Sequence, residues 1–210
     1  MSTKFPFGYY MADMPDDYFP ALGRLQHAFT CLEVSLTGDA AQLVIANPLE
    51  VWDTRTIIAL NAVLGGMRMK DAIDTVKRLH RALNVRPEIR DHADEIFRHI
   101  GDIQHFRNRL THYQTEANTV GSVVEYYNSD LGSNREAAKA KSYKFELSAI
   151  DAATLDLLTS IGSANAIANT ILGHDDCRPF ERQAWRYKPS MLVEMDRQYR
   201  KNPLPLLPPH

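Results

Sequence analysis

The sequence predicts an all-α fold: a bundle of four to five helices, with a β-hairpin inserted before the last core helix and an irregular C-terminal tail. Apolar residues recur at spacings of three and four along most of the chain, which is the period of an amphipathic helix. Residues typical of helix starts and ends flank these runs. We therefore expect an N-terminal arm at 1–16, a helical domain at 17–175 with a hairpin at about 121–148, and a tail at 176–210.

The first half of the chain predicts three helices. Asp17 can cap the first, and Gly38 is its expected end. The inward residues of this helix are Leu22, Leu25, Phe29, Leu32 and Leu36. A second helix is expected between the Asn47-Pro48 start signal and the glycines at 65–66. A third, over 69–83, has the inward residues Ile73, Val76, Leu79 and Leu83.

A fourth and longer helix is predicted to begin at Pro87. Its apolar seam advances by alternate steps of four and three residues through Ile89, Ala93, Ile96, Ile100 and Ile103. The same steps continue to Arg107 and Leu110. A charged guanidinium thus occupies a seam position where an aliphatic side chain belongs, and this singles out Arg107.

After this helix the pattern changes to that of β-strands. The segments 122–127 and 142–147 are rich in strand formers, and Tyr143 and Phe145 alternate with Lys144 and Glu146. We expect a hairpin with a long polar loop at 128–141. A last helix should begin at a Ser148 cap and end at Gly173. Its apolar residues are Leu155, Leu158, Ile161, Ala168 and Leu172.

The composition is that of a globular protein without a strong charge bias. Of 210 residues, 44% are hydrophobic and 24% charged, and the formal net charge is −2, so any contact with nucleic acid must rest on a local patch. The two cysteines, Cys31 and Cys177, lack CxxC spacing, which argues against a cysteine-rich zinc site. The N-terminus does not resemble a secretory signal, and no apolar stretch approaches the ~20 residues of a membrane span. We expect a cytoplasmic protein with no membrane partner.

The segment around Arg107 and His112 combines two residue types suited to chemistry on RNA. Arginine presents a planar set of N–H donors that matches a phosphate and stays charged. Histidine titrates near neutrality and can move a proton. His112 can deprotonate a ribose 2′-hydroxyl or protonate a leaving 5′-oxygen, while Arg107 stabilises charge on the phosphoryl oxygens. We expect the end of the helix to relax so that both side chains reach one ligand.

The run Arg107-Asn108-Arg109-Leu110-Thr111-His112 resembles the motif of HEPN domains, in which an Arg, commonly followed by Asn, Asp or His, precedes a His by four to six residues. The resemblance implies an all-helical bundle, often a homodimer, whose motifs meet in a shared cleft. It implies a metal-independent endoribonuclease without cofactor that serves as a toxin or in phage defence, and it is compatible with a cognate antitoxin or a defence-system partner. By position, Arg107 stabilises the phosphate, Asn108 orients, and His112 is the acid or base. The neighbouring residues expected to contact RNA are Arg109, His105 and Tyr113.

Plainer interpretations compete with each of these roles. Arg107 could form a structural ion pair with Glu33, His112 could bond the last helix carbonyls, and Asn108 could cap the helix end. The histidines at 92 and 99 are predicted to lie on the surface. The sequence contains no HExxH motif, and no metal site is expected. Nothing beside Cys177 suggests activation as a nucleophile.

The tail between positions 178 and 201 has seven basic residues against three acidic ones, interleaved with aromatic residues. This composition suits RNA, but we slightly favour a tail that packs on the bundle or on a second subunit. The first functional hypothesis is therefore a HEPN-type endoribonuclease. The alternative is a non-catalytic HEPN-like module that binds a nucleotide, RNA or a protein partner, and a third is a plain helical interaction protein.

Overall fold

The computed structural model describes residues 16–45, 64–112, 116–127, 141–173 and 183–196. This part of the chain is mostly helical, as predicted, and contains four α-helices and a small antiparallel sheet. The helices are α1 (Tyr18–Ile45), α3 (Met69–Ala82), α4 (Pro87–His112) and α5 (Ser148–Leu172). The strands are β1 (Glu116–Val120), β2 (Val123–Tyr127), β3 (Lys141–Glu146) and β4 (Val193–Asp196), and a short 3₁₀ helix, η1, spans Pro189–Met191. The predicted second helix lies outside the described residues except for its end at 64–66, and so does the arm except for Asp16.

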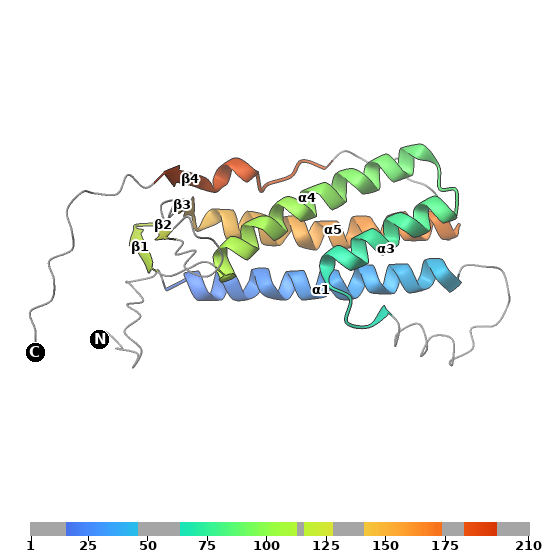
Figure 1. The fold of residues 1–210 in the computed structure, drawn as a ribbon, viewed down its shortest axis with the longest axis horizontal. Helices are drawn as coiled ribbons and strands as arrows, with labels where there is room; N and C mark the ends of the chain where they lie inside the picture. The colour runs from blue at the N-terminus through green and yellow to red at the C-terminus, as the bar shows by residue number, and fades with distance from the viewer. Residues whose placement is uncertain (1–15, 46–63, 113–115, 128–140, 174–182, 197–210) are drawn as a thin grey trace, which may run out of the picture.

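The bundle is built around the parallel pair α1 and α5, which lie side by side along its whole length, while α4 runs in the opposite direction (Figure 1). Two contacts fix the register of the parallel pair: Arg24 pairs with Asp151 at 2.9 Å, and Ser35 bonds to Asn165 at 2.9 Å. Apolar residues from all four helices and from the sheet form one core. Its largest fully buried side chains are Tyr18, Tyr143, Phe106, Leu25, Leu32, Leu36, Leu43, Met69, Ile96, Ile100 and Ile103.

Helix α1 does not end at Gly38, and that prediction is wrong. The helix continues for two further turns because Ala40 and Leu43 are buried in the core, and this burial outweighs the cost of about 1 kcal/mol for a glycine inside a helix. By length and composition α1 would also be long and apolar enough to cross a membrane, contrary to expectation. One of its faces packs on α3 and α5, as in the core helix of a bundle.

The predictions for α3 and α4 are confirmed in most respects. Ile73 and Val76 of α3 are buried, but Leu83 lies just beyond the helix and is 43% exposed, so its inward placement is wrong. The seam of α4 is confirmed, since Ile89, Ala93, Ile96, Ile100, Ile103 and Leu110 are all buried.

Helix α5 spans the predicted residues, and of its predicted core residues Ala168 is buried and Ile161 and Leu172 pack partly against the core, but the other two face outward. Leu155 and Leu158 are each 48% exposed, because α1 and α4 cover the stripe that contains Ala153, Leu157 and Ile167 instead. The Ser148 side chain does not cap the helix; its hydroxyl donates to Glu146 at 3.3 Å. The end at Gly173 is confirmed, and its φ of +74° is the left-handed conformation that glycine adopts readily.

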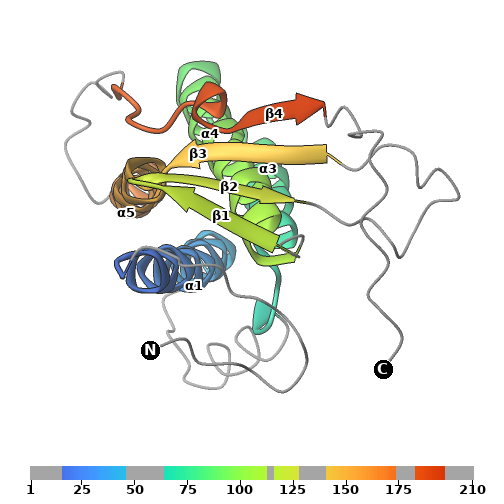
Figure 2. The same cartoon turned by 90° about the vertical axis from the view of Figure 1, so that its left-hand side faces the viewer.

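The sheet covers one end of the bundle and has the strand order β1-β2-β3-β4, all antiparallel (Figure 2). The expected hairpin is confirmed as β2 and β3, and Tyr143 and Phe145 are buried while Lys144 and Glu146 are exposed. Strands β1 and β4 were not predicted. β1 joins β2 through a tight turn at Gly121, whose φ is +64°. β4 comes from the tail and pairs with β3, so the tail contributes to the fold.

Candidate functional site

Arg107 lies five residues before the end of α4, on the side of that helix that meets α1. This position continues the apolar seam of α4 and lies at the edge of the core, near the C-terminal end of the helix. The side chain is half-buried, so part of it remains accessible. Its burial is intermediate between that of a core residue and that of a solvated surface arginine.

Three neutral groups hold the guanidinium of Arg107. Its Nε donates to Gln26 Oε1 of α1 at 2.9 Å, and its Nη1 donates to Asn108 Oδ1 at 3.1 Å. The guanidinium carbon also lies 5.7 Å from the centre of the Phe29 ring, within the range of a cation–π contact. Arginine has five N–H donors, so these two hydrogen bonds fix its orientation and leave others for a ligand.

The ion pair between Arg107 and Glu33 is not observed. Glu33 Oε1 instead accepts a hydrogen bond of 3.0 Å from the backbone nitrogen of Met69, at the start of α3. Among the residues that the structure describes, no carboxylate forms an ion pair with Arg107. Its positive charge is therefore not neutralised within this part of the chain.

Asn108 and His112 occupy the same helix as Arg107. Asn108 is half-buried and fixes the arginine, which agrees with an orienting role. Helix α4 includes His112, so the helix does not relax before this residue as expected. Five residues of regular helix leave positions 107 and 112 about 140° apart around the axis. The side chain of His112 lies outside the described residues.

The three residues expected to contact RNA differ in their surroundings. Arg109 is half-buried and lies over the Tyr143 ring of β3, with its guanidinium carbon 5.0 Å from the ring centre. His105 is exposed on α4. Tyr113 lies outside the described residues. His105 therefore precedes the motif by two residues, while Arg109 lies within it and joins α4 to the sheet.

A second polar cluster, centred on Asp156 of α5, contradicts one prediction. His99 is 6% exposed and bonds to Asp156 at 2.9 Å, so it is not a surface histidine. The carboxylate of Asp156 also accepts from the backbone nitrogens of Arg186 and Tyr187, at 2.9 and 2.8 Å. Trp185 stacks on the His99 ring at 4.1 Å. Asp156 thus anchors the tail, and for residues 183–196 the prediction that the tail packs on the bundle is confirmed.

This cluster could have been found in the sequence. His99 and Phe106 continue a second helical stripe of α4 beside the main seam, and Phe106 stacks on the Tyr187 ring at 5.1 Å. The signal was missed because a histidine in such a stripe also fits a solvated face. Nothing in the sequence indicates that Gln26 accepts a hydrogen bond from Arg107, because this contact depends on how α1 packs near α4.

The described residues contain no group of three or more histidines, cysteines or acids placed to hold a metal ion. Cys31 is a half-buried free thiol beside His27, and Cys177 is outside the described part. Comparison of the chain with models of protein families, with curated proteins and with solved structures gave no match. The chemistry must therefore be argued from the residues themselves.

Proposed function

We propose that the chain is a metal-independent endoribonuclease of HEPN type, in which Arg107, Asn108 and His112 act on an RNA phosphodiester. The observation that supports this most is the state of Arg107. Its guanidinium is fixed by Gln26 and Asn108, is partly accessible, and is not paired with a carboxylate of the described residues. A fixed positive charge with free donors suits a phosphate, because the arginine needs no reorganisation when charge develops there.

The reaction divides between two residues. His112 removes the proton of the ribose 2′-hydroxyl, and the oxygen attacks the adjacent phosphorus. The bond from phosphorus to the 5′-oxygen then breaks, and that oxygen takes up a proton from water, while protonated His112 releases its proton to the solvent. The products are a 2′,3′-cyclic phosphate and a 5′-hydroxyl. Arg107 donates to the non-bridging oxygens throughout, and Asn108 holds Arg107 in this orientation.

We further propose that two copies of the chain build the site together. Positions 107 and 112 lie about 140° apart on α4, so Arg107 of one copy and His112 of the other can face one phosphate across a two-fold axis. Val34, Leu155 and Leu158 expose large apolar side chains on α1 and α5, and a second copy could bury them. We propose that the protein acts on cellular RNA in the cytoplasm, as a toxin or a defence effector.

The test uses purified protein with tRNA and total RNA in EDTA. Wild type should cut, while Arg107→Ala and His112→Ala should lose activity by at least about 100-fold, the usual effect of removing a general acid–base or a charge-stabilising group. Arg98→Ala is the matched control, because Arg98 is an exposed arginine on the same helix. Equal cutting by all variants would indicate a contaminating nuclease. Binding of RNA without cleavage would favour the non-catalytic module.

Mixing the two inactive variants tests the shared site. An equal mixture of Arg107→Ala and His112→Ala chains should recover about a quarter of wild-type activity, because half of the dimers are mixed and each mixed dimer has one intact site of two. Mixed dimers that form without any recovery would show that each copy builds its own site. Native mass spectrometry reports whether the mixed dimers have formed.

A further inference from the structure

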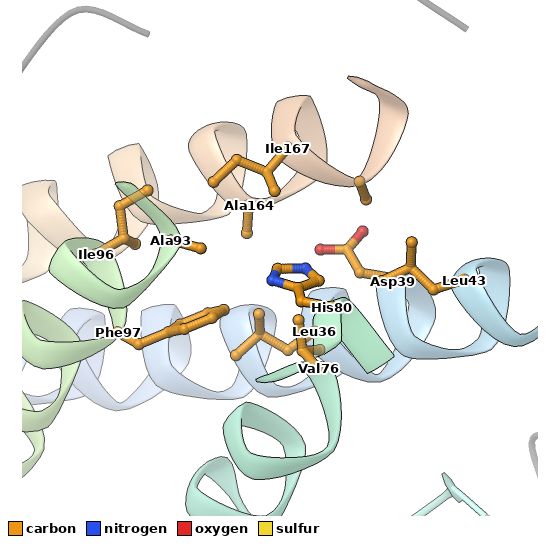
Figure 3. Close-up of a pocket in the computed structure, with 11 residues that line it drawn as sticks. Leu36, Asp39, Leu43, Val76, His80, Ala93, Ile96, Phe97, Ala164 and Ile167 are labelled. Carbon is orange, nitrogen blue, oxygen red and sulfur yellow. The ribbon is translucent and has the colours of Figure 1, made fainter. Parts of the chain in front are cut away.

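A small cavity lies inside the helical core, far along the bundle from Arg107. It is enclosed by α1, α3, α4 and α5, and its lining is apolar except for Asp39 of α1 and His80 of α3. These side chains are 4% and 3% exposed. Figure 3 shows the Asp39 carboxylate and the His80 ring pointing toward one another across it. Two ionisable groups thus share a space that is otherwise lined by alkyl and aromatic side chains.

The cavity volume is about 10 Å³, close to the least that one water molecule needs. That size excludes an organic substrate or cofactor. A single water in a cavity of this size can bond to both the Asp39 carboxyl and the His80 ring. The contents that best fit the chemistry of the lining are one water and an exchangeable proton.

The polar groups next to Asp39 do not compete with Asp39 and His80 for the proton. From α5, the amide of Asn165 reaches Asp39: with its nitrogen facing the carboxylate it donates to the two oxygens at 2.9 and 3.3 Å. Ser35 of α1 bonds to the same amide. With its oxygen facing Asp39, the amide can instead accept a hydrogen bond from the O–H of the neutral acid. Asn165 therefore suits both protonation states of Asp39, and neither it nor Ser35 titrates in this range.

His80 connects the cavity with solvent. The same side chain also lines a polar surface cleft with Lys77, Arg81, Arg90, Asp91 and Asp94. The two ring nitrogens of a histidine can take up a proton on one side and release one on the other. From α4, Asp94 and Arg90 act on His80 with opposite charges, and Asp94 is itself paired with Lys77 at 2.9 Å. His80 is therefore the link between the buried carboxyl and the outside.

We propose that Asp39 and His80 form one buried proton-binding site, in which they share a proton through a single water and exchange it with the surface cleft through His80. Burial affects the two groups in complementary ways. It raises the pKa of Asp39 to about 7 and lowers the pKa of His80 below its usual value, so a single proton on the pair favours Asp39 near neutral pH. The occupancy of the site changes with pH in the neutral range, and with it the charge between α1, α3 and α5. This inference is independent of the proposed ribonuclease activity.

The test follows the titration of both side chains by NMR in the full-length protein, with the Asp39 carboxyl carbon and the His80 ring nitrogens as probes. Asp39 should titrate well above its ordinary value of 3.8. In His80→Gln its midpoint should move by about one pH unit or more, the size of effect expected of a coupled pair. The matched control is His27→Gln, because His27 is an exposed histidine on the same helix as Asp39. It should leave the midpoint unchanged.

Two results would overturn the proposal: an Asp39 midpoint near its ordinary value of 3.8, or a midpoint that His80→Gln does not move. If His80→Gln does not fold, Asp39→Asn provides the reciprocal measurement, in which the His80 titration should move by a similar amount. A water-to-protein nuclear Overhauser effect at the His80 ring reports the bridging water. Its absence would remove the water from the proposal and require direct contact between the two side chains.

Discussion

Asp39→Asn removes the carboxylate of the cavity while preserving the shape of the side chain. In the wild type, burial raises the pKa of Asp39 from 3.8 to about 7, which means that the folded state holds this proton more tightly than the unfolded chain. The stability that Asp39 contributes is therefore fully present below about pH 4 and is lost as the pH rises through about 7. Asparagine does not titrate, so the variant lacks this loss.

The size of the loss follows from the pKa. A rise from 3.8 to about 7 corresponds to about 4 kcal/mol. Hydrogen bonds from Asn165 to the ionised carboxylate oppose it, and such bonds contribute about 1.5–3 kcal/mol to stability, so we expect a net loss of about 1–2.5 kcal/mol. The variant should match the wild type within about 1 kcal/mol at pH 4.5 and exceed it by about 1–2.5 kcal/mol at pH 8.

Urea unfolding at a series of pH values between about 4.5 and 8.5 measures this difference. The lowered pKa of His80 acts in the opposite direction, because the folded state then loses stability as the pH falls below the usual histidine value of 6.5. Because Asp39→Asn is also expected to move the His80 titration, the comparison is repeated in a His80→Gln background, where the difference between the two curves reports Asp39 alone. A difference between the two curves that stays constant with pH would refute the reasoning, since Asp39 would then be ionised at every pH tested.

Four further substitutions test other parts of the structure. Arg107→Ala should lower the free energy of unfolding by only about 1–2 kcal/mol, because it removes two hydrogen bonds to neutral groups; a loss of about 3–5 kcal/mol would indicate a broken ion pair and count against a catalytic role. Asp156→Ala should cost about 3–5 kcal/mol and increase hydrogen exchange at 183–196, and unchanged exchange would show that another contact anchors the tail. Gly38→Ala should stabilise the protein by about 0.5–1 kcal/mol in thermal unfolding, since a methyl group there meets nothing within 4 Å; destabilisation would argue against a continuous α1. Leu158→Lys should shift the chain from dimer to monomer in sedimentation, and an unchanged dimer would exclude this face as the interface.

The positions of α3, α4 and α5 could be predicted from the sequence, because the signals for these helices are local. The seam of α4, the start at Pro87 and the end of α5 at Gly173 all depend on residues within a few turns of one another. The same local pattern singled out Arg107, because a charged residue at an apolar position of the seam can be recognised without knowing which residues contact it. It also identified the alternation of apolar and polar side chains along β3, which is expected of a strand that buries one face and exposes the other.

The tertiary structure decided what depends on contacts between distant segments. Gly38 is a reasonable helix end until the burial of Leu43 is known, and Leu155 fits the core until α1 and α4 are seen to cover another face of α5. Strand β4 forms only because the tail is anchored near β3, more than 45 residues away in the chain.

The polar groups follow the same division. The sequence shows Asp39, His80, His99 and Asp156 as separate residues on separate helices. Only packing brings Asp39 and His80 to one cavity, and His99 to Asp156. A polar group that is buried loses its hydrogen bonds to water and must form new ones with protein groups. For these four residues, the protein groups come from other helices, so the sequence alone does not identify them. Arg107 could be found in the sequence, but its fixed and unneutralised charge could be seen only once Gln26 and Glu33 had been placed in space.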